Sequence, residues 1–179
     1  MTTAPAEPAV VDVIVEDARW EAVALETLAE TAVRATLRHL GLAPAGFEVA
    51  LMAGSDARIA ELNAEFRDKP APTNVLSWPA RDMGAPEAPD TPVPGPADDP
   101  EPLGDIALAW DTCAAEARAA GRPLADHLTH LVVHATLHLL GYDHAEDTQA
   151  AVMESLEVAI LAQLGLPDPY GDVAGERIA

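Results

Sequence analysis

The 179-residue sequence contains a single cysteine, few basic residues and no long apolar run. One cysteine, Cys113, cannot form a disulfide within the chain and cannot supply a thiolate cluster for a metal. No stretch approaches the roughly 18 uninterrupted apolar residues that a membrane-spanning helix requires, and the first residues lack the basic and apolar segments of a secretory signal. We therefore expect a cytoplasmic protein without a membrane partner, in which histidine or carboxylate side chains hold any metal ion.

Basic residues are scarce, since 30 acidic residues stand against 10 basic ones and give a formal charge of −20. Affinity for nucleic acid comes largely from lysine and arginine side chains that neutralise phosphates, so this balance argues against general attraction to RNA or DNA. The acidic residues are unevenly distributed. Residues 82–101 carry six carboxylates and no base, whereas residues 56–81 carry four acidic and four basic residues. Residues 56–81 therefore have no net charge, although the chain as a whole is acidic.

The apolar pattern predicts one domain built from strands and helices. Alternating or short apolar runs predict strands at residues 9–17, 47–54, 74–79 and 103–110. Helical spacing and glycine stops predict helices at residues 20–40, 56–66, 111–120, 123–140 and 146–164. Together these elements predict an α+β fold, a single domain over residues 1–179 with a small mixed four-stranded sheet packed against about five helices.

The segment 80–102 differs from the rest of the chain in composition. It contains seven prolines from Pro86 onward together with the acidic run. This leaves too little apolar surface to fold and too few free φ angles for a helix. We expect an insertion between two strands that forms a loop with little order, and a C-terminal tail at residues 168–179.

Three histidines interrupt an apolar helical pattern in HATLHLLGYDH, residues 134–144. His134 and His138 are one helical turn apart on one face, so both imidazoles can reach a single ion. Gly141 can adopt the left-handed conformation that ends a helix, and the turn after it can return His144 to that ion. Three imidazoles without a fourth protein ligand are typical of a catalytic zinc with an open position, and we expect one zinc ion per chain. Nickel, cobalt and copper also accept such ligands, and the alternative is that the histidines are incidental core or surface residues.

The same histidine spacing occurs in the metzincin metalloproteases, which carry a glutamate directly after the first histidine. In this chain that position is Ala135. The missing glutamate is the general base of peptide hydrolysis, and a positioned base commonly contributes about 10²- to 10⁴-fold in rate. Met153 lies at helical spacing with Leu156 and Ile160, which favours a core methionine over the methionine turn of a metzincin. We expect a zincin-like arrangement of the metal-site helix, with peptidase activity as the weaker functional alternative.

Two further blocks accompany the histidines. They are LNAEFRDKPAPTNVLSWP at residues 62–79 and LGDI at residues 103–106, and the sequence MESLEVAILAQLG follows them. Together with HATLHLLGYDH, these segments resemble the YbeY family of bacterial single-strand-specific metallo-endoribonucleases of ribosomal RNA maturation. The corresponding family motifs are H-G-x-L-H-L-L-G-Y-D-H, L-N-x-x-F/Y-R-x-K-x-x-P-T-N-V-L-S-F-P, L-G-D-I and the final helix.

The resemblance implies a zinc-dependent endoribonuclease in 16S rRNA 3′-end maturation and late ribosome quality control. Its implied partners are single-stranded rRNA and ribosomal particles or ribosome-associated proteins. It assigns His134, His138 and His144 to the metal and Arg67 to catalysis. The chemistry agrees, because a guanidinium is a rigid, permanently charged fork that can grip a phosphodiester and stabilise charge on its oxygens. Lys69 adds a second positive charge for substrate binding.

Four more residues are candidates for supporting roles. Asn74 and Ser77 match the family's T-N-V-L-S strand and are expected to line the substrate site, with a strand-start cap as the alternative. His130, one helical turn before His134, is expected to contact and orient the metal ligands or to act as a proton shuttle, and Asp105 is expected to contact and orient them. A solvated polar face and a charge at a strand entrance explain these last two residues equally well.

Three features depart from the family pattern. Ala135 replaces the usual glycine and is expected to spare the metal while crowding the substrate. Asp68 places a negative charge beside Arg67, where the family commonly has glycine, and the proline-rich insertion is longer than expected. Asp68 and the net charge of −20 both favour a second alternative, a non-catalytic ribosome assembly factor that uses zinc only for stability.

Overall fold

A mixed sheet of four strands forms the centre of the protein. The structure is a computed structural model and describes residues 8–67 and 73–171. The strands are β1 (Val11–Val15), β2 (Phe47–Gly54), β3 (Val75–Pro79) and β4 (Glu101–Ala109). They follow the order β1-β2-β4-β3, in which β1, β2 and β4 are parallel and β3 is antiparallel to β4. The predicted small mixed sheet is confirmed.

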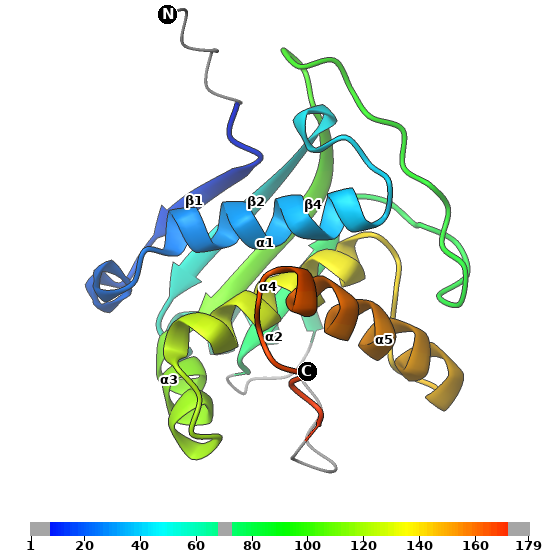
Figure 1. Ribbon diagram of the computed structural model, residues 1–179. Coiled ribbons are helices and arrows are strands. Elements are labelled where there is room, and N and C mark those ends of the chain that lie inside the picture. The colour runs from blue at the N-terminus through cyan, green and yellow to red at the C-terminus, as the bar shows by residue number, and fades with distance from the viewer. Residues whose placement is uncertain (1–7, 68–72, 172–179) are drawn as a thin grey trace, which may run out of the picture.

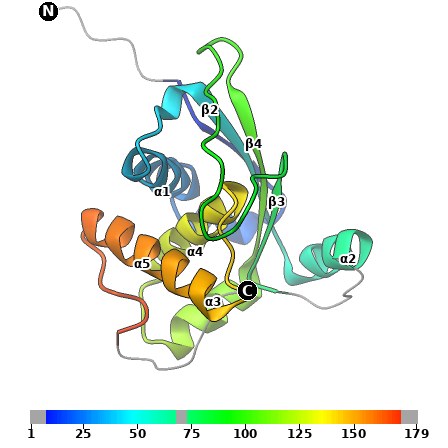
Figure 2. The ribbon, with the colours of Figure 1, turned by 90° about the vertical axis from the view of Figure 1, so that its right-hand side faces the viewer.

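Helices cover both faces of this sheet. In the described residues they are α1 (Leu25–His39), α2 (Asp56–Arg67), α3 (Trp110–Ala119), α4 (Leu124–Leu139) and α5 (Asp147–Gln163). α1, α4 and α5 lie on one face and α2 lies on the other (Figures 1 and 2). The α+β class and the five predicted helices are therefore confirmed. None of the helices within residues 8–67 and 73–171 is long and apolar enough to cross a membrane.

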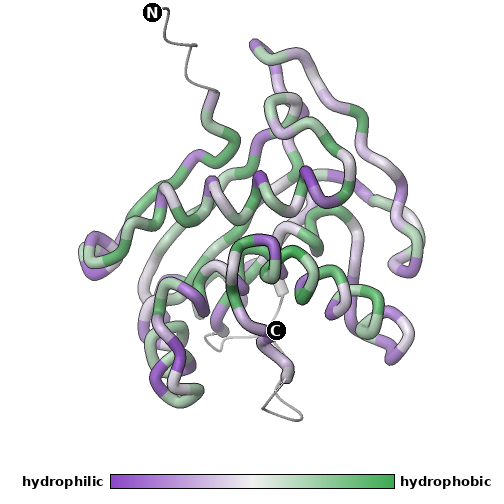
Figure 3. Tube along the Cα trace, viewed as in Figure 1, coloured by the Kyte–Doolittle hydropathy of each residue, from purple (hydrophilic) through white to green (hydrophobic). Residues whose placement is uncertain are grey.

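The two faces of the sheet carry cores of different size. Alternate positions of the strands, such as Leu51 and Ile106, point into the larger core beneath α1 and α4. The smaller core packs Ile59 of α2 against Leu76 and Ala107. Hydrophobic residues concentrate on the central strands and on α4 (Figure 3). A helix that is apolar on most of its surface must be enclosed, and α4 packs against α1, α3, α5 and the sheet.

The start of the chain and of α3 differs in detail from the sequence expectation. The helix predicted from residue 20 is split into a short 3-10 helix, Ala18–Ala22, and α1. Trp20 anchors this break, since its buried indole N–H donates to a carbonyl of β2 at 2.9 Å. α3 begins one residue before the predicted position, at Trp110, and its Asp111 pairs with Arg19 at 2.6 Å. Ser55 caps α2 by accepting a hydrogen bond from the first turn.

The loop between β3 and β4 spans residues 80–100 and contains no helix or strand, as its prolines predict. It nevertheless makes more contacts than its composition predicts. The side chain of Met83 is buried, Glu87 accepts a hydrogen bond from Gln149 of α5 at 2.9 Å, and the Gly95 N–H donates to the Gly46 carbonyl at 2.9 Å. The loop therefore lies against the start of α5 (Figure 1).

Candidate metal centre

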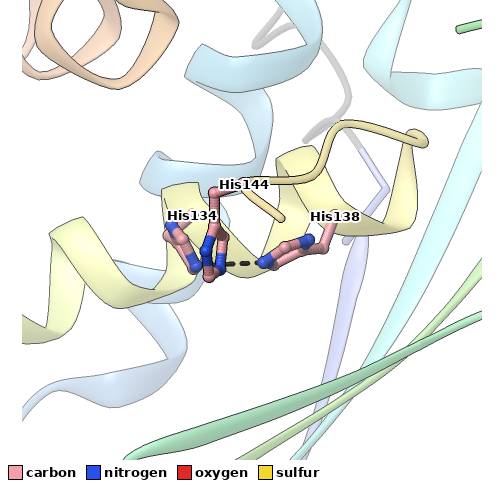
Figure 4. Close-up of side chains that lie close together, drawn as sticks. All are labelled: His134, His138 and His144. Atoms are coloured by element: carbon pink, nitrogen blue, oxygen red, sulfur yellow. Dashed lines mark hydrogen bonds between the residues drawn. The ribbon is translucent and has the colours of Figure 1, made fainter. Parts of the chain in front are cut away.

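The three predicted ligands converge at the C-terminal end of α4 (Figure 4). His134 and His138 project from α4, and His144 comes from the segment that follows it. One ring nitrogen from each side chain lies within 4.8 Å of the other two. The ring of His144 is centred 5.3 Å from that of His134 and 5.1 Å from that of His138. The three imidazoles therefore form a group that can hold one metal ion.

The turn after α4 places His144 in this group. Gly141 has φ +103°, in the region that favours glycine, and its N–H donates to the His138 carbonyl at 3.0 Å. The Tyr142 N–H donates to the Leu137 carbonyl at 3.0 Å, which completes the helix end. The chain then reverses towards α4, as the spacing of the histidines predicts.

Replacing Gly141 with alanine should lower the free energy of unfolding by about 2 to 3 kcal/mol. The added Cβ would meet the Cβ atoms of Met83 at 2.5 Å and Pro89 at 2.9 Å, in addition to the unfavourable φ. Chemical denaturation measures the loss. Gly121→Ala is the matched control, since Gly121 has φ +64° but no neighbour within 4 Å, so only backbone strain of about 1 kcal/mol is expected. Equal losses in the two variants would show that the loop does not constrain this turn.

The hydrogen bonds of the two helical histidines point one nitrogen of each ring at the metal position. Nδ1 of His138 lies 2.9 Å from the Tyr142 carbonyl oxygen, and Nδ1 of His134 contacts a carboxylate oxygen of Glu157. A carbonyl and an ionised carboxylate only accept, so both Nδ1 atoms carry the hydrogen. The Nε2 atoms of His134 and His138 then present lone pairs to each other at 3.0 Å.

This donor set fits a metal ion. Two lone pairs at this separation repel unless a cation lies between them, and two imidazole nitrogens on one tetrahedral zinc ion are about 3.3 Å apart. Burial, followed by the charges of His134 and His144, lowers the pKa of His138 to about 4. His138 is therefore neutral at physiological pH, the form that binds metals.

Glu157 is the residue of this centre that sequence reasoning missed. Its side chain is fully buried in α5, behind His134. Burial acts to raise the pKa of Glu157, but hydrogen bonds with His130 and His134 outweigh it and lower the pKa to about 2. The signal in the sequence was a glutamate one turn after Met153, on a face that is otherwise apolar. Met153 itself is a buried core residue, as predicted.

A cleft of about 570 Å³ lies beside the histidines. Its walls are β3, the turn after α4, the first part of the 80–100 loop and Asn63 of α2. Ser77, predicted to line the substrate site, lies on the wall of the cleft, and Arg81 contributes a positive charge and pairs with Glu101. His138 and His144 also line the cleft, so the metal position is accessible from it.

The other predicted residues lie in different places. The side chain of Asn74 is buried, bonding Glu116 at 3.1 Å and the N–H of Val75 at 2.7 Å, so it holds the start of β3. His130 is buried with Nε2 3.4 Å from Glu157. Asp105 is exposed, and it lies beside Trp78 on the α2 side of the sheet, opposite α4. The structure therefore brings His130 to the centre but not Asp105.

The two predicted cationic residues are largely outside the described part of the chain. α2 ends at Arg67, but the side chain of Arg67 and the whole of Lys69 lie outside the described residues. Asn63, one helical turn before Arg67, lines the cleft. The roles of Arg67 and Lys69 stay predictions.

Fold and site together define an α+β protein with a three-histidine centre beside a cleft. The model of the endoribonuclease YbeY family matches residues 12–165, and the chain belongs to this family. It is 57% identical to endoribonuclease YbeY of Dinoroseobacter shibae over 94% of this chain and 96% of that protein. It is 55% identical to endoribonuclease YbeY of Paracoccus denitrificans over 93% and 94%. The resemblance predicted from three motifs is confirmed.

A solved structure supports the fold independently. The solution structure of TM1509 from Thermotoga maritima has a TM-score of 0.52 with this chain at 21% sequence identity. The similarity covers 93% of this chain and 99% of that one. At this identity the comparison supports the architecture alone, and the zincin-like arrangement of α4 stays a prediction.

Proposed function

We propose that the protein is a zinc-dependent endoribonuclease that cleaves single-stranded RNA in the cytoplasm. Its proposed biological role is 16S rRNA 3′-end maturation and late ribosome quality control, with ribosomal particles or ribosome-associated proteins as partners. The observation that carries the proposal is a three-histidine centre beside a cleft in a chain of the endoribonuclease YbeY family.

Zinc is the metal that the donor set favours. Three neutral imidazoles without a fourth protein ligand are characteristic of catalytic rather than structural zinc sites. A zinc ion bound here would supply Lewis-acid activation of a phosphoryl oxygen or lower the pKa of a water ligand towards about 7. His134, His138 and His144 would hold it, while Glu157 and the Tyr142 carbonyl fix the orientation of two of the rings.

The cleft supports a flexible, single-stranded substrate. Its volume of about 570 Å³ falls in the range of small-ligand pockets, about 300 to 1,000 Å³. A short part of an unpaired strand can enter such a space, whereas a duplex is too wide to do so. We propose that Ser77, on the wall of the cleft, contacts the substrate and that Arg67 and Lys69 neutralise the phosphate.

Specific observations bear on two other functions, one against a peptidase and one in favour of an assembly factor. Ala135 occupies the position of a protease's glutamate and is fully buried in the core, so a peptidase would lack its usual base. A non-catalytic assembly factor is favoured by the charge of −20. Under our proposal, the same charge means that protein contacts on the ribosomal particle, rather than a basic surface, bring the enzyme to its RNA.

Removal of zinc should abolish cleavage and its return should restore it. Protein treated with a chelator should cleave a single-stranded oligoribonucleotide at least about 10²-fold more slowly than protein refilled with one zinc ion per chain. The same sequence annealed into a duplex, and an unstructured protein, are the comparison substrates. Hydrolysis of the unstructured protein would favour the peptidase. Stoichiometric zinc that raises the melting temperature without RNA cleavage would favour the assembly factor.

A further inference from the structure

We propose that Tyr170 and Glu157 form a positioning pair that couples the C-terminal segment, residues 168–171, to the metal ligand His134. The affinity for the metal then depends on a hydroxyl group that lies beyond the last helix. This inference rests on the proposed metal site but is independent of RNA cleavage.

Both oxygens of the Glu157 carboxylate are engaged. Oε1 contacts Nδ1 of His134, and Oε2 accepts a hydrogen bond from the Tyr170 hydroxyl. Nε2 of His130 lies 3.4 Å from the same Oε2 and 3.3 Å from the Tyr170 oxygen. The carboxylate is 0% exposed, so these side chains supply the hydrogen bonds that water would otherwise make.

The contact with Glu157 decides which nitrogen of His134 carries the hydrogen and which presents a lone pair to a metal. A neutral imidazole carries one hydrogen, and a carboxylate at Nδ1 keeps it there, so the Nε2 that faces His138 presents the lone pair. This holds only while Glu157 keeps its position and its charge. The Tyr170 hydroxyl donates to Oε2, whereas Nε2 of His130, at 3.4 Å, is at the long end of hydrogen-bonding distance from it. Tyr170 is thus the stronger restraint on the carboxylate.

Contacts independent of Glu157 hold Tyr170 in place. The Arg122 side chain donates to the Pro169 carbonyl at 2.6 Å, and Asp168 accepts from the Tyr170 N–H at 2.8 Å. The Tyr170 ring meets His130 edge to face, with centroids 5.5 Å apart. The segment after α5 accordingly returns alongside α4 rather than leaving the domain (Figure 1). Residues 168–171, which were expected to belong to a C-terminal tail, therefore pack against the domain.

Zinc affinity of the full chain tests the pair without any RNA. The zinc dissociation constant is measured by competition with a chelator for wild type, Glu157→Gln, Tyr170→Phe and the double variant. Glu157→Gln keeps the shape of the side chain and should weaken binding about 10- to 100-fold. Tyr170→Phe keeps the ring and should weaken binding about three- to tenfold. The double variant should bind no more weakly than Glu157→Gln alone, because the two residues act through one contact.

A second measurement reports on the His134 ring directly. In ¹⁵N NMR of the zinc-free protein, wild-type His134 should show the tautomer with hydrogen on Nδ1, and both single variants should show a mixture. Glu26→Gln removes an exposed carboxylate from α1 and should change neither the dissociation constant nor the spectrum. Thermal unfolding of the zinc-free proteins identifies any variant that fails to fold.

Two results would contradict the proposal that Tyr170 acts through Glu157 on the metal ligand His134. An unchanged zinc affinity in folded Tyr170→Phe would show that the hydroxyl does not restrain the metal site. Losses that multiply in the double variant would show that Tyr170 acts independently of Glu157. Neither result bears on RNA cleavage, and a protein that shows the expected coupling but leaves RNA intact would refute the nuclease proposal alone.

Discussion

Replacing His138 with alanine should reduce the rate of cleavage of single-stranded RNA by about 10³-fold or more. A 10³-fold loss is the upper end of the range observed when one electrostatically stabilising group is removed. The zinc content should fall from about one ion per chain to near zero under a chelator that leaves the wild type loaded. His138 is a ligand with its ring fixed by the Tyr142 carbonyl and its second nitrogen 3.0 Å from that of His134. Two remaining imidazoles cannot hold the ion against competition.

A remote histidine provides the control for this experiment. His39 of α1 lies away from the cleft, where its ring contacts Gln163 at 2.8 Å, and His39→Gln should retain both zinc and cleavage. Rates are compared on the same preparations, with zinc content measured by elemental analysis. If His138→Ala cleaves RNA as fast as His39→Gln and the wild type, the observed activity comes from a contaminating nuclease.

The metal ligands could be predicted from the sequence because their geometry is local. Helical spacing fixes His134 and His138 on one face, and a glycine seven residues after His134 fixes the turn that returns His144. The strands were predictable for the same reason, since alternation along β2 reflects its own two faces. Both inferences need only residues that are close together in the chain.

Of the supporting residues, His130 could be predicted from its helical spacing with His134, but Glu157 and Tyr170 could not. Glu157 reaches His134 because α5 packs on α4, and Tyr170 reaches Glu157 because the chain then turns back, and local spacing predicts neither contact. Asp105 was expected near the metal ligands because of the motif around it in the sequence. Its position in β4 instead directs its side chain to the α2 face of the sheet. Side-chain direction in a strand alternates with each residue, so an error of one residue moves a side chain to the wrong face.

The same contrast applies to the 80–100 loop. Its composition correctly predicts the lack of helix and strand, but composition does not reveal where a loop packs. Met83 and Pro89 lie against Gly141, and Asp82 and Gly84 line the cleft. The insertion thus forms a wall of the candidate site, where Asp82 lines the cleft together with Arg81, which is paired with Glu101. A phosphate in the cleft would be stabilised by a further positive charge, which makes Arg67 the next residue to test.

Arg67→Ala should lower kcat for single-stranded RNA by about 10²- to 10³-fold, as expected when a preorganised donor to a developing charge is removed. Zinc content should not change, because arginine is not a metal ligand. Arg67→Lys should recover only part of the loss, since an ammonium keeps the charge but not the two-pronged geometry. Single-turnover cleavage at saturating enzyme separates this effect on the chemical step from weaker RNA binding.

Arg58 supplies the matched control on the same helix. It is half-buried and pairs with Glu16 at 3.1 Å and Glu61 at 3.2 Å, away from the cleft lining. Arg58→Ala should therefore keep the wild-type rate, because it removes one positive charge from α2 without touching the substrate. Equal rates for the two alanine variants would show that Arg67 contributes only to the overall charge of the surface and not to the chemical step. A loss of zinc in Arg67→Ala would instead show that Arg67 maintains the structure of the metal centre. The cleavage rate and the zinc content together therefore decide whether Arg67 acts on the phosphate.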